Sequence, residues 1–202
     1  MIPIPELAIK GVIEQKLSEI KVNPALLDEI FSGLPAENLN DAKRFFATAK
    51  PVPVLLGWPR EPGQMPCLTI AQAGEQEIDN PIGSELDEEL LLDASGTPVA
   101  VESLEGTWFK GSYRVTAWAG NADLTIYLQA IAKQALLENR GYLTEQGLYE
   151  QVLAGGDFEP APQYIPDFVF LRAVTLNCRY LAIYVVQNTE VAQEAVASMN
   201  GA

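Results

Sequence analysis

The stretch GSYRVTAWAGNADLTIYLQAIAKQALLENRG, residues 111–141, decides the fold. Its first part alternates as a β-strand does, with one set of side chains on each face: Tyr113, Val115 and Ala117, then Arg114, Thr116 and Trp118. After Gly120, apolar residues recur at the spacing of a helix: Leu124, Tyr127, Leu128, Ile131, Ala135 and Leu136. We therefore expect a strand that leads directly into a long amphipathic helix.

The turn between this strand and helix offers little for a ligand. A phosphate loop needs two glycines, a lysine and a hydroxyl in the pattern GxxxxGK followed by Ser or Thr, and a dinucleotide loop needs GxGxxG. The turn WAGNADL has one glycine and fits neither pattern. We interpret it as a corner at which Asn121 or Asp123 caps the helix, and Gly141 fits the position after the helix end.

The rest of the chain predicts more helices and strands. Helical patterns cover residues 5–20, with Leu7 and Leu17 on the apolar face, residues 23–34, with Asn23 as N-cap, and residues 38–50. Strands are expected at 52–58, 67–73 and 167–186, a shorter helix or turn at 142–153, and a loop at 154–166. The order predicts an α+β fold, in which one long and several shorter helices pack on an antiparallel sheet. We expect a single domain over residues 1–202, with a frayed tail at 187–202.

The charge is strongly negative and unevenly spread. The formal net charge is −14, and residues 61–105 hold eleven acidic side chains and no basic one. We interpret 61–105 as an acidic excursion, rich in Pro and Gly, that is partly a strand hairpin. A chain with this balance is not expected to bind DNA by neutralising phosphates, although it could surround DNA without gripping it.

The residue types also limit the chemistry. The sequence has no histidine, which removes Ser-His and Cys-His catalysis and His-ligated metal sites. Cys67 and Cys178 lie in apolar contexts and are expected to be buried and reduced. The acidic run does not fit a calcium-binding loop, and no aromatic side chains accompany it to line a sugar cleft. We expect no catalytic residue, no cofactor and no metal.

Two loops carry candidate contact residues. GWPRE, residues 57–61, places Trp58 and Arg60 beside prolines, and both residue types are favoured at protein interfaces, although Trp58 in the core is an equal alternative. GGDFEP, residues 155–160, is expected to be a tight loop held by Phe158, with an anion-binding nest around Asp157 as the less favoured alternative.

These elements resemble the tail-terminator and neck proteins of tailed bacteriophages. The resemblance rests on the N-terminal amphipathic helix, the strand GSYRVTAWAGN before the helix DLTIYLQAIAKQALLENRGYL, the GGDFEP loop and the late strand FVFLRAVTLNCRYL. In that strand, Phe170, Arg172, Val174 and Leu176 occupy the family's aromatic–Arg–Leu pattern. The resemblance covers about residues 1–20 and 106–185, and the acidic middle is longer than the family pattern.

The resemblance implies a structural virion protein without enzymatic activity: a ring of six subunits that caps the tail tube. Tail-tube or sheath protein would lie below the ring and a neck or connector protein above it, and DNA would pass through the channel. The resemblance implies assembly in the host cytoplasm, and the sequence indicates neither a signal peptide nor a membrane span.

Three alternatives stay open beside the tail terminator: another head-to-tail connector ring, a soluble binding module, or an assembly chaperone. Under the ring hypothesis, part of the acidic cluster faces the channel, with Glu85, Asp87, Glu88 and Glu89 as the candidate residues. Trp58, Arg60, Asp157 and Phe158 are then the candidates for subunit contacts.

Overall fold

The structure is a computed structural model, and it describes residues 3–78, 85–92, 98–157 and 169–188. Helices accompany a six-stranded sheet, which confirms the predicted α+β class. The elements in chain order are α1 (Pro5–Val22), η1 (Pro24–Leu26), α2 (Leu27–Ile30), α3 (Ala36–Thr48), β1 (Val54–Leu56), η2 (Pro62–Gln64), β2 (Cys67–Ile78), β3 (Glu85–Leu92), β4 (Pro98–Ala119), α4 (Ala122–Glu138), α5 (Arg140–Glu145), β5 (Tyr149–Asp157) and β6 (Phe170–Asn188).

The chain divides into two compact units. The larger unit contains residues 4–75 and 111–179, and the smaller unit contains residues 1–3, 76–110 and 180–202. Strands β2, β4 and β6 contribute residues to both units. All the helices in the described residues belong to the larger unit.

The sheet is mixed, so the expectation of an antiparallel sheet is wrong. The strand order is β1-β2-β4-β6-β5, with β3 paired to β4 outside that path. Pairs β3–β4 and β5–β6 are antiparallel, but β1 runs parallel to β2, with Val54 opposite Leu68. Residues 57–66 connect β1 to β2, and this connection is too long for a hairpin turn. It carries the chain back to the start of its neighbour, so both strands point the same way.

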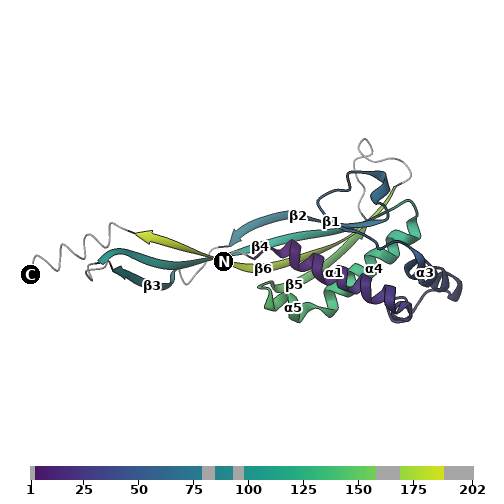
Figure 1. The fold of residues 1–202 in the computed structure, drawn as a ribbon, viewed down its shortest axis with the longest axis horizontal. Coiled ribbons are helices and arrows are strands. Elements are labelled where there is room, and N and C mark those ends of the chain that lie inside the picture. Colours follow the sequence, from purple (N-terminus) through teal and green to yellow (C-terminus); the bar gives the residue numbers. More distant parts are fainter. Residues whose placement is uncertain (1–2, 79–84, 93–97, 158–168, 189–202) are drawn as a thin grey trace, which may run out of the picture. The chain divides into compact units, whose positions relative to one another are not determined.

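Helices α1 and α4 pack against each other over the sheet (Figure 1). Ile9, Ile13 and Ile20 of α1 are fully buried, and each contributes about 1.5–3 kcal/mol by leaving water. The buried face of α4 contains five of the six predicted residues, Tyr127, Leu128, Ile131, Ala135 and Leu136, whereas Leu124 is only partly buried. In α1, however, Leu7 is half-exposed and Leu17 is only partly buried, so two positions of the predicted apolar face lie at its margin.

Helix α4 begins as the sequence predicts but ends differently. Asn121 Oδ1 accepts a hydrogen bond from the Asp123 backbone N–H at 2.7 Å, so Asn121 is the cap. Gly141 does not end the helix, because it lies inside α5. The left-handed glycine after these helices is Gly147, with φ of 85°.

Strand β5 is an element that the sequence analysis missed. Residues 149–153 were expected in a helix or turn and residues 154–157 in a loop, but they form a strand that pairs with β6 at Tyr149 and at 152–157, where Leu153 lies opposite Leu176. A bulge between Tyr149 and Val152, with Glu150 at φ 49°, hides the alternation, and two glycines follow it. Gly155 to Asp157 are therefore a strand end, and the predicted tight loop is wrong for these three residues.

The sheet is buried on both faces where β1, β2 and β4 meet. Cys67 and Thr69 point to one face of β2 and Leu68 and Ile70 to the other, and all four are buried. On the first face, Cys67 packs with Trp118 and Leu171. Met65 of the 57–66 connection packs on this small second core, as do Leu55 of β1 and Val169 before β6.

The smaller unit is a strand assembly. Strand β3 runs antiparallel to β4, with Glu88 opposite Ser103, which confirms a hairpin within the acidic excursion. Phe109 stacks on Tyr180 with ring centroids 5.6 Å apart, and Tyr184 Oη donates to Glu105 Oε2 at 3.0 Å. Of the tail expected at 187–202, residues 187 and 188 end β6, and the remainder lies outside the described residues.

Candidate subunit interface

Trp58 lies on the surface, but it is anchored to the core. Its side chain is 58% exposed, and its ring meets Trp118 edge to face with centroids 5.5 Å apart. Trp118 is buried, and its Nε1 donates to Thr69 Oγ1 at 2.8 Å. An aromatic side chain held in one orientation with more than half its surface in water is suited to contact another protein, because it loses little entropy on binding.

Hydrogen bonds within the connection and to β2 hold the segment that carries Trp58 and Arg60 in place. Gly57, at φ 84°, donates its N–H to Ile70 O at 2.8 Å, and this bond fixes the connection beside β2. Gln64 Oε1 accepts from the backbone N–H groups of Arg60 at 2.8 Å and Glu61 at 3.4 Å. The Arg60 side chain is exposed. The connection is therefore a shaped surface feature of the larger unit.

The other predicted contact residues are less fully defined. Asp157 is the last residue of β5, where it lies opposite Arg172 of β6, and Phe158 lies outside the described residues. The four acids Glu85, Asp87, Glu88 and Glu89 lie along β3, in the smaller unit. Trp58, Arg60 and Asp157 belong to the larger unit, so the structure assigns the predicted contact residues and the predicted channel acids to different units.

Two different strands form the ends of the sheet in the larger unit, β1 at one and β5 at the other. Among the described strands, each pairs on one side only. Each also carries a large apolar side chain in water: Leu56 of β1 is 50% exposed, and Val152 of β5 is 60% exposed. Unpaired strand edges and exposed apolar side chains are features by which a sheet can recruit another chain.

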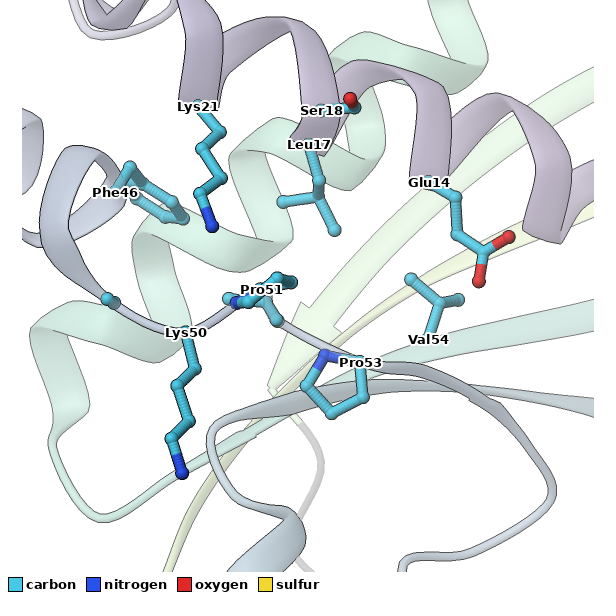
Figure 2. A pocket seen from close by; sticks show the side chains of 11 residues that line it. Glu14, Leu17, Ser18, Lys21, Phe46, Lys50, Pro51, Pro53 and Val54 are labelled. Atoms are coloured by element: carbon cyan, nitrogen blue, oxygen red, sulfur yellow. The ribbon is translucent and has the colours of Figure 1, made fainter.

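A groove of about 360 Å³ opens between α1, the end of α3 and the segment that leads into β1. Its middle is apolar, with Leu17, Pro51 and Pro53 (Figure 2). Figure 2 shows Lys21 beside Phe46 at one end, with Lys50 on the same side and its side chain pointing away from Pro51, and Glu14 with Val54 at the other end. Its volume is at the lower limit of small-molecule sites, roughly 300–1,000 Å³. The groove therefore suits a few side chains of a partner better than a cofactor.

The two lysines of the groove differ from the cations around them in their ion pairs. Each of the other cations of α1 and α3 has an acidic partner within 4.0 Å: Lys10 with Glu14, Lys16 with Glu138, Lys43 with Asp28 and Arg44 with Asp41. In the described part of the chain, no acidic group pairs with Lys21 or Lys50, and both are exposed. Two positive charges at one end of the groove are thus available to an acidic partner.

The thiols are not placed for chemistry. Cys67 and Cys178 are free and buried, as predicted. Burial raises the pKa of the Cys67 thiol to about 11 and that of Cys178 to about 12, so both are protonated at neutral pH. Within the described residues, no three Asp, Glu or Cys side chains gather closely enough to hold a metal ion. Nor is any helix in that part of the chain long and apolar enough to cross a bilayer.

Neither the groove nor the β5 edge was predicted from the sequence. No local pattern marked the groove, because its lining comes from α1, the end of α3 and the segment before β1. None marked β5 either. The sequence matches no protein-family model, and no curated protein matches it.

Proposed function

We propose that this protein is a ring-forming structural component of a bacteriophage tail or neck: a tail terminator that caps the tail tube and offers a surface to the head. The protein acts without enzymatic chemistry. The observation that carries the proposal is the pair of unlike sheet edges in the larger unit, β1 with Leu56 and Trp58 beside it, and β5 with Val152.

Unlike edges fit a ring because of symmetry. A contact between two copies of one patch closes after two subunits, whereas a contact between two different patches repeats until the rotation closes a ring. The edge at β1 of one copy would face the edge at β5 of the next. Strand pairing and the burial of exposed apolar side chains would both stabilise such a contact.

The negative charge supports the same role. A channel that conducts DNA must not bind it, and a chain of net charge −14 has few cations to offer to phosphates. The repulsion comes from the summed charge of the subunits around the channel. The assignment of Glu85, Asp87, Glu88 and Glu89 to the channel wall stays a prediction.

The direct test combines the purified protein with polymerising tail-tube protein of the phage that encodes it. Negative-stain images should show a ring at one end of each tube, and tube growth should stop at that end. A protein that stays monomeric and leaves tube length and tube ends unchanged would contradict the proposal and favour a binding module or chaperone.

Variants at the two edges test the ring contact. Leu56→Lys and Val152→Lys each place a charge at one exposed edge, and each alone should abolish rings. Val22→Lys is the matched control, because Val22 is 84% exposed on α1 and belongs to neither edge. If Leu56→Lys abolished rings while Val152→Lys did not, the contact would not join these two edges.

A further inference from the structure

We propose that the groove between α1, α3 and β1 receives strand β3 of a second copy of this chain. Residues 85–92 read ELDEELLL, so four acids precede three consecutive leucines. The acids would lie at the end of the groove that holds Lys21 and Lys50, and the leucines over its apolar middle. The inference rests on the proposed ring, because it names a contact between neighbouring subunits.

Charge complementarity is the first reason for this occupant. Lys21 and Lys50 are exposed and have no acidic partner among the described residues, whereas the neighbouring cations Lys10, Lys16 and Lys43 are all paired. Segment 61–105 carries eleven acids and no base, and β3 contains four of them. The groove thus offers the cations that the acidic segment lacks.

The order of residues along β3 is the second reason. An acidic end followed by an apolar end matches a groove that has cations at one end and an apolar middle (Figure 2). The opposite direction would bring the acids of β3 toward Glu14, where like charges repel. The pairing therefore has one favoured direction, as a specific contact requires.

The pairing of β3 is the third reason. Among the described strands, β3 pairs only with β4. An extended strand can enter a groove with its backbone groups still able to hydrogen-bond. The groove and β3 are different patches of one chain, so their contact is heterologous and consistent with a ring.

This contact changes the expected role of the β3 acids. If Glu85, Asp87, Glu88 and Glu89 bind a neighbouring groove, they do not line the channel. The remaining acidic residues of the chain would then repel the DNA.

Charge reversal tests the contact. One variant, Lys21→Glu with Lys50→Glu, makes the groove acidic, and the other, Glu85→Lys, Asp87→Lys, Glu88→Lys and Glu89→Lys together, makes β3 basic. Each alone should lower the fraction of subunits in rings on tube ends by roughly tenfold or more, because like charges then face each other. The control is Lys133→Glu with Arg140→Glu, which changes the net charge as the groove variant does, at exposed positions outside the groove.

Mixing the two variants shows whether the contact joins two chains. In a 1:1 mixture, every acidic groove can meet a basic β3 of a neighbour and every basic groove an acidic β3, so rings with an even number of subunits should return. A contact within one chain would not be restored by mixing, but would be restored by combining both sets of substitutions in one chain. That pattern would overturn the inference.

Two further outcomes separate the inference from the proposed function. If the wild-type protein forms rings and the groove variant behaves as the control does, the inference is wrong and the proposed function stands. If the wild-type protein forms no ring, both the groove–β3 contact and the proposed function are wrong. Particles with rings of mixed variants should also eject DNA at the wild-type rate, whereas slower ejection would place the β3 acids at the channel.

Discussion

Lys16 Nζ lies 2.6 Å from Glu138 Oε2, and this ion pair joins α1 to α4 across 122 positions of the chain. Lys16 occupies a buried position on the core face of α1, and Glu138 is partly exposed at the end of α4. Gln134 Nε2 also donates to Glu138, at 2.8 Å. The pair satisfies a nearly buried cation at the contact between the two helices that cover the sheet.

The first prediction concerns this pair. Glu138→Gln should lower the free energy of unfolding at pH 7 by about 1 kcal/mol, because it leaves a buried ammonium group without its counter-charge, while solvent near Glu138 limits the loss. Urea denaturation followed by circular dichroism measures it. Glu14→Gln, at the exposed pair with Lys10, is the control and should cost less than about 0.5 kcal/mol.

The same pair gives a pH dependence. Partial burial acts to raise the pKa of Glu138, but hydrogen bonds from Lys16 and Gln134 outweigh it, so the pKa lies below its usual value. The stability that Glu138 contributes is therefore present above its unfolded-state pKa and lost as pH falls through the lower folded-state pKa. The difference between wild type and Glu138→Gln should shrink as pH falls toward 3. A constant difference would contradict the assignment.

The second prediction concerns the second core. Thr69→Val should lower the free energy of unfolding by about 1–3 kcal/mol, because the buried Trp118 N–H would lose its acceptor. Thr107→Val breaks an exposed bond to Glu77 and should cost no more than about 0.5 kcal/mol. Thermal unfolding followed by tryptophan fluorescence compares the two. Equal losses would show that the Trp118 bond has no special weight.

The third prediction concerns two glycines in strands. A Cβ added at Gly111 would lie 2.6 Å from the ring of Tyr113, which is fully buried and cannot move aside. Gly111→Ala should therefore cost about 1–3 kcal/mol. A Cβ at Gly74, in β2, would meet nothing within 4 Å, so Gly74→Ala should be nearly neutral. Chemical denaturation of both variants tests the pair, and a neutral Gly111→Ala would rule out close packing of the Tyr113 ring over residue 111.

The fourth prediction concerns the thiols. With pKa values raised to about 11 and about 12, Cys67 and Cys178 should not react with a disulfide reagent in the native protein at pH 8. Labelling should follow unfolding in urea. Ser18→Cys, at an exposed position of α1, should react at once and serves as the positive control. Rapid labelling of two thiols per native wild-type chain would contradict their burial.

Local patterns of the sequence were enough for the β4–α4 unit. The alternation in residues 111–119, the cap at Asn121 and the apolar face of α4 are set by side chains within one or two turns of each other. Strand β5 was not predicted, because a bulge at Glu150 and two glycines remove the alternation, and β5 is a strand only through its pairing with β6. The parallel pairing of β1 was not predicted either, because it depends on where residues 57–66 carry the chain.

The candidate interface divides in the same way. The sequence by itself determined the α+β class, the charge of segment 61–105 and Trp58 as a candidate contact, because composition and short-range periodicity carry these properties. Only the tertiary structure decided that Trp58 rests on Trp118 and that Lys21 and Lys50 share one end of a groove. Both are contacts between side chains far apart in the chain, and long-range packing sets them, which no local pattern records.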